Sequence, residues 1–203
     1  MILYGASGHG KVIIDILESM GEMNIEIWDD AEKDPIWDYP VIQPFPHGYA
    51  VDDLLIISIG NNATRKKVAE RLGDKVEFGM AVHAFVCTSE RTIIDEGTVV
   101  MAGVIINPDV QIGKHCIINT SCSIDHDCVI ADYAHISPNA TLSGDVRVGE
   151  GTHIGAGATV IQGIRIGKWC TIGAGAVVIR DIPDYATAVG NPARIIKVKE
   201  PEQ

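Results

Sequence analysis

Histidine is the residue type in this chain best suited to proton transfer, because an unperturbed imidazole has a pKa of about 6.5. His126 lies between two aspartates, Asp125 and Asp127. His135 follows His126 by nine residues, and His153 follows His135 by eighteen. Asp127 reaches the His126 ring only where the backbone turns, because adjacent residues of a strand point to opposite faces. What these histidines can do therefore depends on the element that carries them.

The segment that carries these histidines has an aliphatic residue at every sixth position from Ile94 to Val178, without an insertion. Four positions after each aliphatic residue the side chain is small or of modest volume, with Ile164 as the exception. A period of six matches neither the 3.6-residue period of a helix nor the alternation of a single strand. It predicts a coil of three short strands joined by tight corners, with one hexapeptide on each side.

The aliphatic residues of such a coil point into a prism, and residues eighteen apart stack on one face at about 4.8 Å. Five coils predict a prism about 24 Å tall. His153 is then expected to stack on His135, and Gly144 to lie beside His126. Because His126 and His135 are half a coil apart, their imidazoles cannot meet within one chain.

Three cysteines, Cys116, Cys122 and Cys128, repeat at the same six-residue spacing. Successive hexapeptides lie on different sides of the prism, so the three thiols are spread apart and cannot form a four-ligand metal site. We interpret them as packing residues and expect no metal in the protein.

The first eighty residues have a different pattern, which predicts a parallel α/β unit. Short apolar strands are expected at residues 2–4, 25–28 and 52–59, and helices at residues 11–20 and 63–72. The turn from Gly5 to Gly10 has the spacing G-x-x-G-x-G, which is neither the dinucleotide fingerprint nor a Walker A loop. Its glycines could let a phosphate approach the N-terminus of the helix, and a tight strand–helix turn alone would explain them equally well.

The sequence therefore predicts two domains: a Rossmann-like βαβαβ domain over residues 1–84, and an all-β parallel helix with a C-terminal tail over residues 85–203. The chain has 16 Lys+Arg against 27 Asp+Glu and a net charge of −11, so we expect no nucleic-acid partner. The five cysteines do not suggest a secreted disulfide framework. The apolar start, Met1 to Tyr4, is far shorter than a signal peptide or a membrane span. We expect a cytoplasmic protein.

From about Thr88 to the C-terminus the chain resembles the hexapeptide acyltransferase superfamily. The tail Val189-Gly190-Asn191-Pro192-Ala193-Arg194 after the last coil is typical of its CoA-dependent members. The resemblance implies a left-handed β-helix, a homotrimer, and acetyl-CoA bound in the groove between subunits. It implies the following residues at the acetyl-CoA site: His135, Gly144, Gly155, Gly173, Pro192 and Arg194.

Over essentially its whole length the chain resembles the sugar O- and N-acyltransferases of bacterial glycan synthesis. Three segments joined to this β-helix carry the likeness: Tyr4 to Lys11, Trp28 to Asp30 and Ser58 to Arg65. The resemblance implies acetyl-CoA-dependent acetylation of the amine of a UDP-linked 4-amino sugar, with His126 as general base beside Asp127. It also implies that the nucleotide is held by Gly8, His9, Gly10, Asp29, Asp30, Asn61, Asn62 and Arg65.

Three alternatives stay open. A sugar O-acetyltransferase of the sialic acid type would use the same fold and donor. A γ-type carbonic anhydrase is also a hexapeptide trimer, but it predicts two zinc-binding histidines about five residues apart, and His115, His126, His135 and His153 provide no such pair. A non-catalytic β-helix used for assembly would require neither His126 nor the tail.

Overall fold

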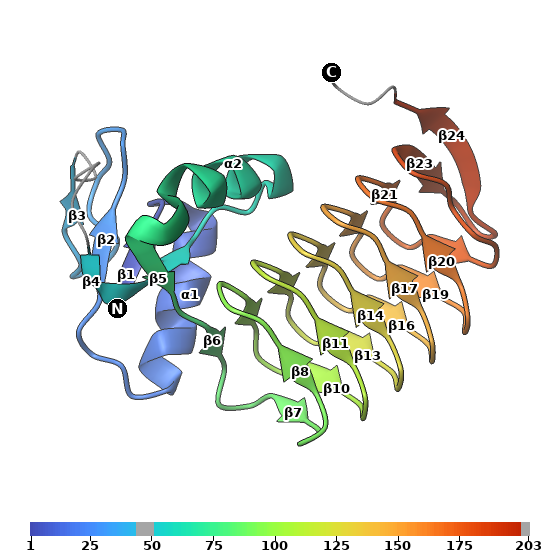
Figure 1. Cartoon of the computed structure of the whole chain (residues 1–203), viewed down its shortest axis with the longest axis horizontal. Helices are drawn as coiled ribbons and strands as arrows, with labels where there is room; N and C mark the ends of the chain where they lie inside the picture. Colours follow the sequence, from blue (N-terminus) through green and yellow to red (C-terminus); the bar gives the residue numbers. More distant parts are fainter. Residues whose placement is uncertain (44–50, 200–203) are drawn as a thin grey trace.

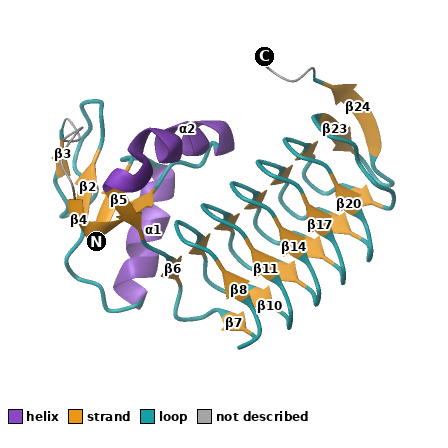
Figure 2. Cartoon of the chain, in the orientation of Figure 1, coloured by secondary structure: helices purple, strands orange, loops and turns teal. Residues whose placement is uncertain are grey.

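The computed structural model describes residues 1–43 and 51–199 of the chain. Figure 1 shows a small α/β unit at the N-terminal end of a long solenoid of strands. Both helices belong to the α/β unit, and the solenoid is built of strands and loops alone (Figure 2). Within the described residues, neither helix combines the length and the hydropathy needed to span a membrane.

The α/β unit is a five-stranded parallel sheet in the order β3-β2-β1-β4-β5. Its elements are β1 (Ile2–Tyr4), α1 (Gly8–Ser19), β2 (Glu26–Trp28), β3 (Val41–Ile42), β4 (Val51–Ile57), α2 (Asn62–Leu72), the 3-10 turn η1 (Gly73–Lys75) and β5 (Val76–Phe78). Strand β1 lies in the middle of the sheet and is buried, as are Leu55 to Ile57 of the neighbouring strand β4, which explains the apolar sequence of these two segments. The predicted Rossmann-like unit is confirmed. Helix α1 begins three residues earlier than expected, and the two-residue strand β3 was not expected.

The solenoid is a parallel β-helix of two-residue strands, as the period of six predicted. Its strands are β6 (Ala81–Val82), β7 (Cys87–Thr88), β8 (Ile93–Ile94), β9 (Val99–Val100), β10 (Ile105–Ile106), β11 (Gln111–Ile112), β12 (Ile117–Ile118), β13 (Ser123–Ile124), β14 (Val129–Ile130), β15 (His135–Ile136), β16 (Thr141–Leu142), β17 (Arg147–Val148), β18 (His153–Ile154), β19 (Thr159–Val160), β20 (Arg165–Ile166), β21 (Thr171–Ile172) and β22 (Val177–Val178). The tail adds β23 (Ala186–Val189) and β24 (Arg194–Val198). Strand β6 already pairs with the solenoid, so the solenoid sheet begins before the expected division at residues 84 and 85.

Three sheets form the sides of the prism, and each is made of every third strand. We call them sheet C (β6-β9-β12-β15-β18-β21-β23-β24), sheet D (β7-β10-β13-β16-β19-β22) and sheet E (β8-β11-β14-β17-β20). Residues eighteen apart are paired, for example Ile118 with Ile136 and His135 with His153. The aliphatic residues and the small residues of each hexapeptide fill one continuous core. The corners have positive φ angles, which are 62° at Asp127 and 64° at Gly151.

Helix α1 joins the two units through an apolar contact. Its buried residues Ile13, Ile14 and Leu17 belong to the same core cluster as Val99 and Ile117 of sheet C. The α/β unit therefore covers the start of one solenoid face, and the rest of that face continues beyond it.

Arg65 of α2 joins the two units through hydrogen bonds. Its Nε donates to the His115 carbonyl at 2.8 Å, and Nη2 donates to the Tyr133 carbonyl at 2.9 Å, both on the solenoid. Nη1 donates to the carbonyls of Ile59 and Gly60, at 3.0 and 3.3 Å. The second N–H of Nη2 donates to Asn62 Oδ1 at 2.9 Å. All five donors of a guanidinium are therefore used, and burial lowers its pKa only to about 10, so it stays charged at neutral pH.

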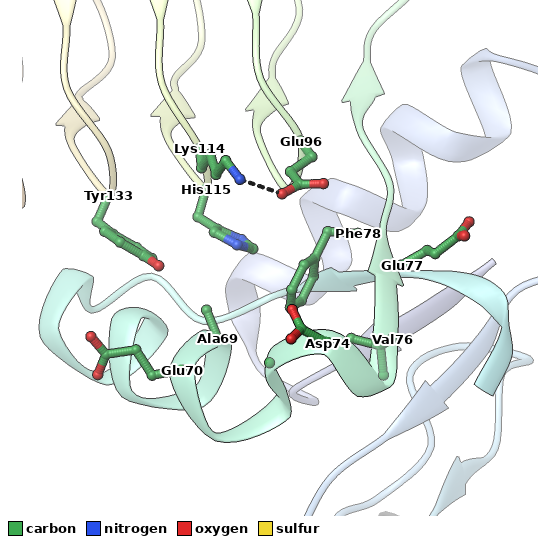
Figure 3. A pocket seen from close by; sticks show the side chains of 11 residues that line it. Ala69, Glu70, Asp74, Val76, Glu77, Phe78, Glu96, Lys114, His115 and Tyr133 are labelled. Atoms are coloured by element: carbon green, nitrogen blue, oxygen red, sulfur yellow. Dashed lines mark hydrogen bonds and ion pairs between the residues drawn. The ribbon is translucent and has the colours of Figure 1, made fainter. Parts of the chain in front are cut away.

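Aromatic contacts surround this junction. The ring of His115 stacks on Tyr133 with centroids 5.3 Å apart, and meets Phe78 edge-on at 4.4 Å. Figure 3 shows these three rings between α2 and the solenoid, beside the ion pair of Lys114 with Glu96. Burial lowers the pKa of His115 to about 4, so this ring acts as a neutral aromatic group.

The junction makes a testable prediction. Replacing Arg65 with Met keeps most of the side-chain volume but leaves four backbone carbonyls without their donor. We expect the free energy of unfolding to fall by about 2–5 kcal/mol, because each buried unsatisfied acceptor costs about 1–3 kcal/mol. Urea unfolding at fixed protein concentration measures the change. Lys67→Met on the exposed face of the same helix is the control, with an expected change within about 0.5 kcal/mol. Equal unfolding midpoints for the two variants would contradict this account.

Candidate active site

His126 and Asp127 form a hydrogen-bonded pair at a corner of the solenoid between β13 and β14. The positive φ of Asp127 turns its side chain back, so that Oδ2 lies 2.6 Å from Nδ1 of His126. This hydrogen bond is the main reason why the pKa of His126 is raised, and the nearby Asp125 adds to the effect. With Nδ1 held as a donor to Asp127, Nε2 presents its lone pair, which is the arrangement of a general base.

Asp125 has a different role from Asp127. Its Oδ1 accepts the backbone N–H of His126 at 2.8 Å and the Nδ2 hydrogen of Asn107 at 2.7 Å. The bond from Asn107 is the main cause of the lowered pKa of Asp125. Asp125 therefore fixes the backbone of the corner, while Asp127 contacts the imidazole itself.

Gly144 lies directly beside the imidazole, as the eighteen-residue spacing predicted. A Cβ atom at Gly144 would lie 2.7 Å from both Cε1 and Nε2 of His126. The absence of a side chain there is what lets the imidazole rest on the next coil. The ring lies in a shallow depression lined by Asp125, His126, Ser143, Gly144, Asp145, Gln162 and Gly163. The depression is open to solvent, and the His126 side chain is 59% exposed.

A second histidine group lies on sheet C, on another side of the prism. The rings of His135 and His153 are stacked with centroids 4.7 Å apart and planes 4° apart. Burial, followed by the neighbouring His153, lowers the pKa of His135 to about 3, so its imidazole is neutral at physiological pH. His9, in the first turn of α1, also affects the pKa of His135. Burial lowers the pKa of His9 itself to about 4.

The tautomer of His135 follows from its neighbours. Oδ1 of Asn119 accepts the backbone N–H of Thr120 at 2.8 Å, which turns the amide nitrogen toward His135. That nitrogen lies 3.0 Å from Nε2 of His135. A neutral ring that accepts at Nε2 carries its proton on Nδ1, so His135 can donate a hydrogen bond to an acyl oxygen.

The predicted nucleotide residues fall into two groups. Gly8, His9 and Gly10 form the first turn of α1, where Ser7 makes no side-chain capping bond. Asp29 accepts the backbone N–H of Ala6 at 2.8 Å and so ties the glycine turn to the end of β2. Asp30 pairs with Arg71 at 3.1 Å and accepts from the Tyr4 hydroxyl. This group lies around the N-terminus of one helix, which is a favourable place for a phosphate.

The second group, Asn61, Asn62 and Arg65, lies where α2 meets the solenoid. Arg65 uses every donor within the junction. Asn62 donates to the Gly151 carbonyl at 3.0 Å, and Asn61 caps α2 by accepting from Thr64 N at 2.9 Å. These three residues therefore position α2 on the solenoid, and their role in nucleotide binding stays a prediction.

The expected acetyl-CoA residues near the tail are dispersed. A Cβ at Gly155 would lie 2.5 Å from the Ile172 carbonyl oxygen, and one at Gly173 would lie 2.8 Å from Val189. Both glycines are thus required for close stacking of the coils. Pro192 follows a cis peptide bond, and Arg194 opens β24 with an exposed side chain.

The residues that sequence reasoning missed are Asn107, Asn119 and Ser137. Ser137 lies 2.7 Å from Nε2 of His153, as Asn119 lies near His135. Each of these two polar residues precedes its histidine by sixteen positions. A search for polar residues sixteen positions before each histidine would have found Asn119 and Ser137. Among the described residues, no three histidine, cysteine, aspartate or glutamate side chains are grouped so that they could hold a metal.

Both units of the chain match known protein families. Residues 1–72 match the family described as the PglD N-terminal domain, and residues 109–144 and 145–180 match the bacterial transferase hexapeptide family. UDP-N-acetylbacillosamine N-acetyltransferase from Bacillus subtilis is 45% identical over 108 residues. This match covers 49% of the chain and spans 50% of the length of that protein.

Solved structures match over nearly the full length. A histidine variant of perosamine N-acetyltransferase from Caulobacter crescentus, in complex with CoA and GDP-perosamine, is 36% identical with a TM-score of 0.90. The match covers 97% of this chain and 96% of that one. The acetyltransferase domain of PglB from Neisseria gonorrhoeae is 33% identical with a TM-score of 0.91, covering 96% and 98%.

The contact between His126 and Asp127 predicts a titration shift. In Asp127→Asn the carboxylate that favours the imidazolium is lost, so the pKa of His126 should fall and its NMR titration midpoint should move to lower pH. Asp145→Asn removes a more distant carboxylate and is the matched control, with a smaller shift in the same direction. An unchanged midpoint in Asp127→Asn would show that the contact does not form in solution.

Proposed function

Because the chain belongs to the family of hexapeptide-repeat N-acetyltransferases that carry a PglD N-terminal domain, we propose that it transfers the acetyl group of acetyl-CoA to the amine of a nucleotide-linked amino sugar. The observation that carries this proposal is the pair formed by His126 and Asp127, which provides a general base on the solenoid surface. A UDP-linked 4-amino sugar is the acceptor we propose first, since the Bacillus relative is named for a UDP-sugar.

In the proposed reaction the amine nitrogen attacks the carbonyl carbon of the thioester, and Nε2 of His126 takes the proton that the nitrogen loses. The carbon–sulfur bond then breaks, and CoA leaves as the thiol after taking a proton from the imidazolium. Asp127 stabilises the imidazolium between these two transfers. We propose that the Nδ1 hydrogen of His135 faces the acyl oxygen, where negative charge develops.

We propose that the nucleotide binds at the glycine turn and the N-terminus of α1. Two features support this position: the open space beside Gly8, where a Cβ would meet no atom within 4 Å, and the uncapped first turn of the helix. The net charge of the chain is −11, so backbone N–H groups there would favour a phosphate without a basic surface.

We also propose a homotrimer with each active site between two subunits. His126 and His135 lie on different sides of the prism, so one site needs them from two chains. Phe85, Ile93 and Ile105, which are 79%, 58% and 47% exposed, give the solenoid apolar surface that a neighbour would cover. The free thiols of all five cysteines fit the cytoplasm, which we propose as the compartment.

The activity is tested by measuring release of the CoA thiol from acetyl-CoA with UDP- and GDP-linked 4-amino sugars and with free sialic acid. Turnover is expected with one amino-sugar nucleotide. His126→Ala should lower it by at least about 10²-fold, because the base is lost. Lys75→Ala, at an exposed position of η1, is the control, and its turnover should be unchanged. Turnover with sialic acid alone would replace the proposed acceptor with a sugar hydroxyl, and full activity in His126→Ala would reject the proposed base.

The shared site is tested by mixing two inactive variants. His126→Ala and His135→Ala subunits refolded together should regain activity, because about one interface in four then combines an intact His126 with an intact His135. Each variant refolded alone is the control and should stay inactive. A mixture as inactive as its components would reject the proposal that one active site combines His126 and His135 from two subunits.

A further inference from the structure

A cleft separate from His126 and from the glycine turn lies between α2 and the last coils of the solenoid. It has a volume of about 460 Å³ and is lined by Ala63, Lys66, Lys67, Glu70, Trp169, Tyr185 and Lys199. This volume falls in the usual range of small-molecule sites, about 300–1,000 Å³. We call it the α2 cleft.

Two aromatic residues on the solenoid side of the α2 cleft adopt an unusual backbone conformation. Trp169 and Tyr185 have φ angles of 54° and 60°, at a row of corners where Gly97 and Gly151 also lie. Glycine takes this conformation without cost, whereas a bulky residue with positive φ is uncommon. Positive φ angles recur at the corners of the solenoid, including His115 and Tyr133 in the same row, so this conformation belongs to the coil itself. Both rings are half-buried, so each keeps a surface open to solvent.

Gly151 makes room for the Trp169 indole. A Cβ at Gly151 would lie 2.4 Å from Cε3 and Cζ3 of the indole, so the ring lies flat over the preceding coil. The ammonium of Lys66 lies 5.6 Å from the Trp169 ring centroid and is held by Glu150 at 2.5 Å. The indole is therefore fixed from two sides, and it is a rigid platform on one wall of the α2 cleft.

The α2 cleft is also a local concentration of positive charge in an acidic chain. Lys66, Lys67 and Lys199 line it, and Lys168 lies with its ammonium 5.7 Å from the Tyr185 ring centroid. Lys66 is paired with carboxylates, but across residues 1–43 and 51–199 no carboxylate lies within ion-pair distance of Lys67, Lys168 or Lys199. The unpaired ammonium groups favour an anion, while the rings favour a flat apolar group.

We propose that the α2 cleft binds a nucleotide, with its base against Trp169 and Tyr185 and its phosphate between Lys67 and Lys199. Bases of every type stack on aromatic side chains, and lysine binds phosphate as a point charge. The sources are the 3′-phosphoadenosine part of CoA and the nucleotide of a sugar nucleotide. Binding itself does not require acetyl transfer, so the proposal can hold or fail independently of the proposed function.

The test is a titration of the full chain with adenosine 3′,5′-bisphosphate, UDP and GDP in turn, followed by tryptophan fluorescence. At least one nucleotide should quench the fluorescence in the wild type, and this quench should be absent in Trp169→Phe. The double variant Lys67→Gln with Lys199→Gln should raise the Kd by at least about tenfold, because two phosphate contacts are lost. Lys75→Gln, an exposed lysine outside the α2 cleft, should leave the Kd unchanged.

The three titrations distinguish the sources. Trp169-dependent quenching by adenosine 3′,5′-bisphosphate alone identifies the acetyl donor as the ligand of the α2 cleft. Trp169-dependent quenching by UDP or GDP alone places the sugar nucleotide in the α2 cleft and moves it from the glycine turn. Quenching by adenosine 3′,5′-bisphosphate that survives in full in Trp169→Phe, or a Kd that the double lysine variant does not change for any of the three nucleotides, overturns the proposal. Quenching by UDP or GDP that survives in Trp169→Phe reports the separate site proposed at the glycine turn, near Trp28. Equal displacement of every nucleotide by inorganic pyrophosphate at matched concentration would show a simple anion site and would overturn the role of the rings.

Discussion

The backbone hydrogen bonds between successive coils fix which side chains of this protein can meet. They pair each residue with the one eighteen positions away, so a short pattern in the sequence becomes a row of neighbours in space. His126 rests on Gly144 for this reason, and His135 stacks on His153. Asn107 reaches Asp125 through the same register. The chemistry of the surface is thus set by the repeat of the core.

The solenoid places its histidines in two opposite electrostatic environments. His126 is exposed at a corner beside a carboxylate, so its protonated form is stabilised. His135 and His153 stack on a flat side of the solenoid, where burial of the two rings favours the neutral imidazole. One ring can therefore accept a proton near neutral pH, while the others remain neutral hydrogen-bonding groups. Such a separation of pKa values divides the roles of base and donor in an acyl transfer.

The solenoid could be predicted from the sequence because every hexapeptide repeats the same physical demand, an aliphatic residue inside and a small residue at the corner. The pairing of Asp127 with His126 was less predictable, since it depends on the positive φ of one corner residue. The structural role of Arg65 could not be predicted from the sequence, because an arginine after two asparagines also resembles a phosphate site. Its guanidinium donates to the backbone carbonyls of His115 and Tyr133, which are far away in the chain. Every residue type has such a carbonyl, so the sequence does not indicate these contacts. The nucleotide and acetyl-CoA residues remain predictions.

The Arg65 contacts have a consequence for how this chain can change over evolution. On the solenoid side the guanidinium binds only main-chain oxygens, and every residue type supplies one of these. Side chains at the two partner positions can therefore be replaced without removing the hydrogen bonds. At these two positions the junction places no demand on side-chain identity, whereas the apolar contact of α1 and the ion pair of Lys66 with Glu150 depend on particular side chains. Sequence change at His115 and Tyr133 is therefore tolerated by this part of the junction as long as the backbone of the two corners keeps its place.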